Sequence, residues 1–124
     1  MNGGEWLVDT NIIIYLVSGD RTVSDLLEDQ SIYLSFITKI ELFAFKKLKS
    51  REEEVIKAVI DHSHVIFADY DTTKVAIKFR RKYNLKLPDA IIAASAETHN
   101  LPFVTADTDF NRVSEVDIVQ YRDS

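Results

Sequence analysis

The sequence predicts an α/β fold: a three-layer sandwich with a mostly parallel central sheet of about five strands. Two observations lead to this prediction. Short segments rich in β-branched and aromatic residues have the length of buried strands, and longer segments with helical spacing of apolar residues lie between them. Short parallel strands need helical crossovers, so this alternation favours a parallel sheet. The 124 residues fit one compact domain, residues 1–124.

The first half of the chain predicts two strands and four helices. The strand Trp6–Val8 is apolar throughout, and Ile32–Leu34 has the same character. The segments between and after these strands show helical spacing, which predicts helices over Asn11–Val17, Thr22–Glu28, Thr38–Leu48 and Arg51–His62.

The second half predicts three strands and two helices. After the strand Val65–Phe67, the clearest helix runs over Thr72–Tyr83, with an apolar stripe on one side, basic residues on the rest and Asp71 as its predicted cap. The next helix begins at Asp89, directly after Pro88. The last predicted strands are Phe103–Val104 and Ile118–Val119.

Composition excludes several classes of protein. Apolar residues make up 46% and charged residues 28%, as in soluble globular proteins. There are no cysteines, which excludes disulfides, thiolate metal sites and cysteine nucleophiles and makes a reducing cytosol the expected location. The longest apolar run, Ile12–Val17, is far shorter than the ~20 residues of a membrane span, so no membrane association is expected.

The net charge of −5 argues against a protein that coats nucleic acid through overall positive charge. It leaves a nuclease open, because clustered carboxylates can hold divalent cations that reverse the local charge. The positions of the acids therefore matter more than their number.

Four acids are predicted to lie at one edge of the sheet. In a parallel α/β sheet, helix N-termini gather beside the carboxyl ends of the strands, where function usually sits. Asp9 follows the first strand, Glu41 lies about one turn into a helix, Asp89 opens another, and Asp107 follows the strand at 103–104. All four should project from that edge.

Each acid also has a purely structural explanation. Asp9 and Asp89 could be N-caps, Thr38 with Glu41 has the spacing of a capping box, and Asp107 or Asp109 could cap a turn. As a set, however, converging carboxylates raise each other's pKa and destabilise a fold unless cations neutralise them. Oxygen donors without cysteine favour Mg²⁺ or Mn²⁺.

The chain resembles the PIN-domain ribonucleases, and most of all the VapC-type toxins of bacterial toxin–antitoxin pairs. The resemblance rests on four acidic runs that occur in order over nearly the whole chain: LVDTN at 7–11, ITKIEL at 37–42, LPDAIIA at 87–93 and TADTDF at 105–110. It implies a metal-dependent endoribonuclease that cleaves single-stranded RNA segments, a cognate antitoxin as partner and a homodimer.

The resemblance also assigns residues. Asp9, Glu41, Asp89 and Asp107 match the family's metal-binding and catalytic quartet, with Thr10 and Asn11 as supporting polar positions. Whether Asp107 or Asp109 is the closer metal ligand stays open. Metal ions held by such carboxylates can activate water and stabilise charge on the phosphate, so no protein nucleophile is needed.

A basic stretch precedes Asp89. Residues 74–86 contain six Lys or Arg side chains and no acid, in a chain that is acidic overall. The stretch is either a solvated helix face or a track for the phosphate backbone beside the acids. The second interpretation assigns RNA binding to Lys78, Arg81 and Lys82.

Other functions remain as alternatives. A response-regulator-like receiver domain has similar size and class, with Asp69 as the candidate phospho-acceptor, but Asp9 lacks the neighbouring acid that such a domain needs. A haloacid-dehalogenase-type phosphatase would need its D-x-D-x-T run early, whereas Asp107-Thr108-Asp109 comes late. A catalytically inactive PIN-like binding module is the third alternative.

Overall fold

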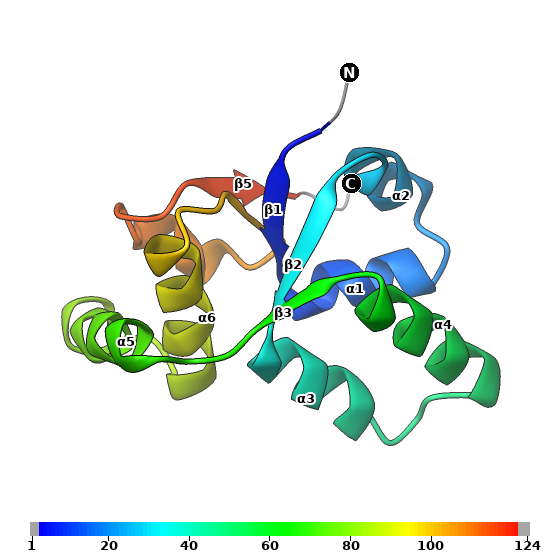
Figure 1. Cartoon of the computed structure of the whole chain (residues 1–124), viewed down its shortest axis with the longest axis horizontal. Helices are drawn as coiled ribbons and strands as arrows, with labels where there is room; N and C mark the ends of the chain where they lie inside the picture. Colours follow the sequence, from blue (N-terminus) through cyan, green and yellow to red (C-terminus); the bar gives the residue numbers. More distant parts are fainter. Residues whose placement is uncertain (1–2, 122–124) are drawn as a thin grey trace.

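Five parallel strands form one sheet at the centre of the computed structural model, which describes residues 3–121 (Figure 1). The order of the strands is β3-β2-β1-β4-β5, and every pair is parallel. The bounds are β1 Glu5–Val8, β2 Ser31–Ser35, β3 His64–Ile66, β4 Phe103–Thr105 and β5 Ile118–Gln120. The predicted strands are therefore all present, most of them one residue longer than predicted.

In the described part of the chain, six α-helices and one short 3₁₀-helix connect the strands. Their bounds are α1 Thr10–Val17, α2 Arg21–Leu27, α3 Phe36–Ala44, α4 Ser50–Asp61, α5 Tyr70–Tyr83, α6 Leu87–Thr98 and η1 Thr108–Arg112. Within residues 3–121, no helix is both long enough and apolar enough to cross a lipid bilayer.

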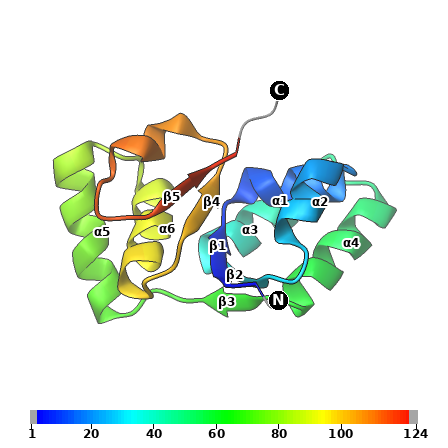
Figure 2. The ribbon, with the colours of Figure 1, turned by 90° about the horizontal axis from the view of Figure 1, so that it is seen from above.

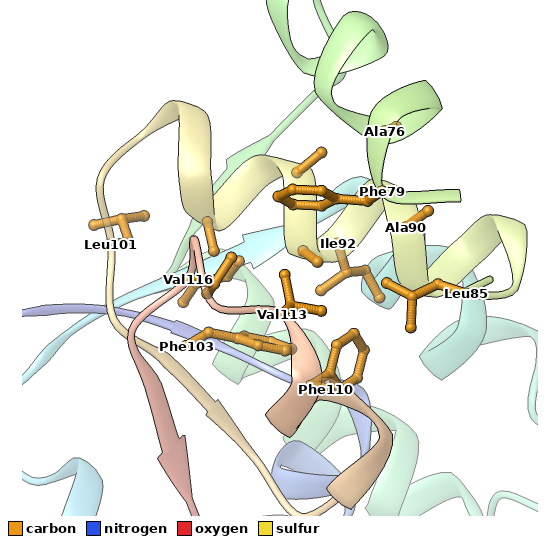
Figure 3. Packing of buried hydrophobic residues seen from close by; sticks show 14 of the residues in the cluster. Ala76, Phe79, Leu85, Ala90, Ile92, Leu101, Phe103, Phe110, Val113 and Val116 are labelled. Carbon is orange, nitrogen blue, oxygen red and sulfur yellow. The ribbon is translucent and has the colours of Figure 1, made fainter. Parts of the chain in front are cut away.

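The helices cover both faces of the sheet, so the predicted three-layer α/β sandwich is confirmed (Figure 2). Helices α5 and α6 pack on one face, where Phe79 and Ile92 meet Phe103 and Phe110 from β4 and η1 (Figure 3). Helices α1, α2 and α4 pack on the other face, against Val8, Leu34 and Val104. Alternate residues of β1 and β4 thus serve opposite cores, as the period of a strand requires.

Several helix starts differ from the prediction, and at α3 and α5 the reason is that a polar side chain two or three residues earlier takes the capping position. Asp69, and not Asp71, caps α5: its carboxylate accepts from the Thr72 amide at 2.8 Å. Helix α3 begins at Phe36 behind the cap Ser35 and ends at Ala44, so it is shifted from the predicted 38–48. Helix α6 begins at Leu87 and places Asp89 in its first turn.

The strand order creates a switch point between β1 and β4. The chain proceeds outward from β1 to β2 and β3, and then crosses to the other side of β1 for β4 and β5. At such a point, crossovers leave the sheet in opposite directions and open a crevice at the carboxyl ends of the strands. Asp9 directly follows β1, and Thr105 ends β4, so both stand at this crevice.

Candidate active site

Asp9 is the most buried acid at the switch point, with 7% of its surface exposed. It caps α1, where one carboxylate oxygen accepts from the Thr10 amide at 2.9 Å. The other oxygen accepts from the Thr105 hydroxyl at 2.7 Å. The N-cap explanation of Asp9 is therefore correct but incomplete, since a cap needs neither this burial nor the bond to β4.

Burial raises the pKa of the Asp9 carboxyl to about 6, although the bonds from Thr105 and Thr10 work in the opposite direction. The charges of Asp89 and Asp107 contribute to this increase after burial. The pKa of Asp89 is also raised, first by burial and then by Asp107 and Glu41. Acids from four separate segments thus interact electrostatically at this edge. Their repulsion lowers the free energy of unfolding.

Glu41 is held across the site and is not part of a capping box. Its carboxylate accepts from the Thr10 hydroxyl at 2.6 Å, and that hydroxyl also lies 3.0 Å from the Thr38 hydroxyl. Thr38 is fully buried and lies inside α3, whose cap is Ser35, so the capping-box explanation is wrong. Thr10 therefore links α1 to the acid of α3.

Asp107 and Asp109 lie together at the start of η1. Asp107 caps η1, and its carboxylate accepts from the Asp109 amide at 2.9 Å. The Asp107 amide donates to the Thr105 hydroxyl at 3.0 Å, which ties this loop to the group that binds Asp9. Asp107 is half-buried and acts on both Asp9 and Asp89, whereas Asp109 is exposed and acts on Asp89.

The donor set fits a hard divalent cation in its chemistry. It consists of carboxylate and hydroxyl oxygens, which favour Mg²⁺ or Mn²⁺ over softer metals. Among residues 3–121, however, no group of three or more His, Cys, Asp or Glu side chains is arranged so that it could hold a metal ion. The fit to a divalent cation thus rests on the oxygen donors and on the negative charge of the neighbouring acids. The side chains are not already arranged as a complete set of metal ligands.

The structure places the predicted basic residues on α5 and pairs two of them. The Lys78 and Lys82 ammonium groups each lie 3.3 Å from the Glu115 carboxylate, which also accepts from the Tyr83 hydroxyl. These contacts, the Tyr83 bond above all, lower the pKa of Glu115 to about 2. Arg81 is exposed, and Asn11 is exposed in the first turn of α1.

Sequence reasoning did not find Thr105 and Thr38, the buried hydroxyls of the site. Thr105 was missed because the predicted strand ended at Val104, so the threonine was read as part of the loop. Its position two residues before Asp107 was the available signal. Thr38 was interpreted as a cap, and only the true start of α3 shows that it lies inside the helix.

Two further features lie apart from the acids. A cavity of about 690 Å³ is lined by residues of α1, α2 and α4 and by Gln30 and Ile32 near the start of β2, and the acids of the site do not line it. The three histidines are all exposed.

Comparison with known proteins identifies the family. The family model of the PIN domain matches residues 6–116. The chain belongs to the PIN domain family. The resemblance of the four acidic runs to this family is therefore confirmed. A separate search of curated proteins finds no match.

Solved structures resemble this PIN domain along nearly its whole length. A toxin–antitoxin complex from Klebsiella pneumoniae contains a chain with 34% identity and a TM-score of 0.80, covering 93% of this chain and 96% of the other. VapBC2 from Rickettsia felis, bound to a DNA fragment from its promoter, has 18% identity, a TM-score of 0.78 and coverages of 95% and 99%. VapBC-1 from nontypeable Haemophilus influenzae has 24% identity, a TM-score of 0.75 and coverages of 94% and 97%.

The topology of this PIN domain also removes the receiver alternative. Receiver domains have the strand order 2-1-3-4-5, with the third strand at the centre. Here β3 is an edge strand, and Asp69, which lies beyond it, caps α5. The acidic pair at 107 and 109 follows β4 and not the first strand, which also argues against the phosphatase alternative.

Proposed function

We propose that this PIN domain is a divalent-metal-dependent endoribonuclease that cleaves single-stranded RNA and acts as the toxin of a toxin–antitoxin pair. The observation that carries the proposal is the buried carboxylate of Asp9 at the switch point, whose pKa the charges of Asp89 and Asp107 raise. Such an arrangement destabilises the free protein, and a bound cation relieves it.

The metal is proposed to be Mg²⁺ or Mn²⁺, held by Asp9, Glu41, Asp89 and Asp107, with Asp109 as a further candidate ligand. When bound, the ion supplies an activated water and neutralises charge on the phosphate. Asp9 is the fixed member of the set, because both of its oxygens already accept hydrogen bonds. Asp107 is the closer ligand in this proposal, because its charge acts on Asp9 while Asp109 is exposed.

The supporting residues hold the acids in place. The Thr10 hydroxyl orients the Glu41 carboxylate, and Thr105 orients Asp9. At neutral pH the Asp9 carboxyl, with its pKa of about 6, is mostly ionised and able to bind a cation. Exposed cations of α5 are proposed to hold the phosphate backbone. Arg81 would contact a phosphate directly, whereas Lys78 and Lys82 would first exchange their ion pairs with Glu115 for contacts to phosphates.

The test of the enzymatic proposal is incubation of the purified protein with total RNA, with Mg²⁺, with Mn²⁺ and with EDTA. The wild type should cut RNA only with a divalent ion, and Asp9→Asn should lose the activity. Asp69→Asn is the matched control, because it removes the same charge from a capping aspartate that does not contribute to the raised pKa of Asp9 or Asp89. Loss of activity in both variants, or in neither, would contradict the assignment; an inactive wild type favours a binding module.

The proposed partners are an antitoxin and a second copy of the chain. The complex from Klebsiella pneumoniae, 34% identical over 93% of this chain, supports an antitoxin. Such an inhibitor is proposed to place a basic side chain among the carboxylates, where it relieves their repulsion. Growth arrest on expression in bacteria, absent for Asp9→Asn and relieved by the product of a small neighbouring gene, tests the toxin assignment. Sedimentation tests the homodimer.

A further inference from the structure

Two aromatic rings stand at the carboxyl edge of the sheet, beside the acids. Ser35 and Ile66 are register partners at the ends of β2 and β3, and Phe36 and Phe67 are the residues that follow them. Their rings stack with centroids 6.0 Å apart and planes inclined by 20°. Phe36 is half-buried, whereas Phe67 is 67% exposed. Phe67 thus offers a ring to solvent, with a second ring behind it.

The neighbours of the pair carry two of the acids. Phe36 is the first residue of α3, the helix that holds Glu41. Ala68, which follows Phe67, lines a small apolar pocket together with Leu87 and Ile91, the residues on either side of Pro88, Asp89 and Ala90. The pair is thus connected through Phe36 to the helix that holds Glu41, and through Ala68 to a pocket lined by the helix that holds Asp89. Two strand spacings, roughly 10 Å, separate β3 from β1, the strand that Asp9 follows.

An exposed ring and basic residues follow the pair along the chain. Tyr70, at the start of α5, is 77% exposed, and the Lys74 ammonium lies 5.5 Å from the centroid of its ring. The same helix continues with four further basic residues up to position 82, and Lys86 follows after its end. Exposed rings between an acidic edge and a basic helix suit a strand that has both flat bases and a charged backbone.

We propose that Phe67, supported from behind by Phe36, stacks against an unpaired base of the RNA within a few nucleotides of the phosphate that is cut. The inference rests on the proposed function, because it takes single-stranded RNA as the substrate. A base needs a planar ring at this position, whereas an interface with a second copy needs only apolar area. This difference makes the two occupants distinguishable.

The test compares Phe67→Trp, which keeps a ring, with Phe67→Leu, which keeps apolar area without one. Binding of a labelled single-stranded RNA of about eight nucleotides is measured by fluorescence anisotropy in EDTA. Phe67→Leu should bind roughly 5-fold to 150-fold more weakly, the range that corresponds to the loss of one stacked base. Phe67→Trp should bind about as well as the wild type. Val55→Ala, at an exposed apolar position on α4, should change nothing.

A series of strands with one abasic position each locates the stacked base. One abasic position should weaken binding by the wild type and have no effect on Phe67→Leu, because the partner ring is already missing. An abasic effect that persists in Phe67→Leu, or wild-type affinity of Phe67→Leu for every strand, would overturn the proposal. So would equal loss of affinity in the Trp and Leu variants together with dissociation of a dimer in sedimentation, which would assign the rings to an interface between copies.

Cleavage of the intact strand by the wild type in Mg²⁺ or Mn²⁺ is measured in parallel. Ring-dependent binding without cleavage would refute the enzymatic function and leave the stacking site standing. Cleavage by the wild type, together with RNA binding that does not depend on the ring, would refute the stacking site and leave the enzymatic function standing.

Discussion

The Thr105 hydroxyl donates to the Asp9 carboxylate at 2.7 Å, across 96 positions of sequence. The same hydroxyl oxygen accepts from the Asp107 amide at 3.0 Å. A hydroxyl has one proton, so accepting from Asp107 leaves that proton to be directed at Asp9. One buried side chain thus fixes the orientation of the central acid and the position of the loop that carries a second acid.

Replacing Thr105 with valine should weaken both functions of this hydroxyl. The change leaves a buried carboxylate and a backbone amide short of one partner each, so the free energy of unfolding should fall by about 1–3 kcal/mol or more. Mn²⁺ affinity should fall as well, since Asp9 loses its orientation. Urea unfolding and calorimetric titration measure the two effects. Thr105→Ser, which keeps the hydroxyl, should restore most of both; equal defects in the two variants would contradict the role of the hydroxyl.

The stability of the metal-free protein should depend on pH through Asp9. Its pKa is about 6 in the folded state against 3.8 for an unperturbed aspartate side chain, so the folded state holds the proton more tightly. The contribution of Asp9 to the free energy of unfolding is therefore greatest below about pH 4. It falls by about 3 kcal/mol as the pH rises through 6.

The comparison with Asp9→Asn isolates this contribution. Because the variant cannot ionise at this position, the difference in unfolding free energy between wild type and variant should shift against the wild type from pH 4 to pH 8. Urea unfolding in EDTA at a series of pH values measures it. A difference that stays constant over this range would show that the Asp9 pKa is not raised.

Thr10→Val should release Glu41. The substitution removes the hydroxyl that donates to the Glu41 carboxylate at 2.6 Å. The exposed carboxylate then becomes free to turn toward solvent. Loss of such a supporting bond typically lowers metal affinity by about 10-fold to 100-fold, and the fall should be seen in a Mn²⁺ titration. Thr10→Ser should retain affinity near that of the wild type. If Thr10→Val binds Mn²⁺ normally, Glu41 does not depend on this bond.

Glu115→Gln should strengthen RNA binding if Lys78 and Lys82 contact phosphates. The substitution removes the carboxylate that both ammonium groups now face at 3.3 Å. Affinity for single-stranded RNA should rise, and the slope of log affinity against log salt should steepen by about 0.7 for each added phosphate contact. Glu97→Gln, at an exposed position on α6, changes net charge equally and serves as control.

Equal effects of the Glu115 and Glu97 substitutions would mean that net charge alone acts. The triple substitution Lys78→Gln, Arg81→Gln, Lys82→Gln should weaken binding and flatten the salt dependence. Unchanged affinity at every salt concentration would make α5 a solvated helix face.

The order of strands and helices could be predicted because periodicity is local. The run of β-branched and aromatic residues at Trp6–Val8 and the apolar stripe of α5 are each visible within a few residues. Helix starts were harder, because Asp69 and Asp71, or Ser35 and Thr38, are both chemically able to cap. Which one caps depends on where the preceding strand ends, and β2 is extended to Ser35 by pairing with Ile66 of β3.

The site could be predicted in part. The placement of Asp9, Asp89 and Asp107 at one edge follows from topology, and the contribution of Asp107 to the raised pKa of both Asp9 and Asp89 agrees with it. The bond from Thr10 to Glu41 and the bond from Thr105 to Asp9 could not be predicted, because each joins residues from distant segments. The pairing of Lys78 and Lys82 with Glu115 could not be predicted for the same reason: a basic stretch looks unpaired when its partner lies 33 residues beyond Lys82.

The central claim is that the acids at the switch point bind a divalent cation. Its most direct test is the melting temperature of wild type, Asp9→Asn, Asp89→Asn and Asp69→Asn with and without millimolar Mn²⁺. The wild type and Asp69→Asn should melt at higher temperature when Mn²⁺ is added, because an ion that binds the folded state stabilises it. Asp9→Asn and Asp89→Asn should lose most of that increase. A wild-type melting curve that Mn²⁺ leaves unchanged, or an equal increase in all four proteins, would contradict the claim.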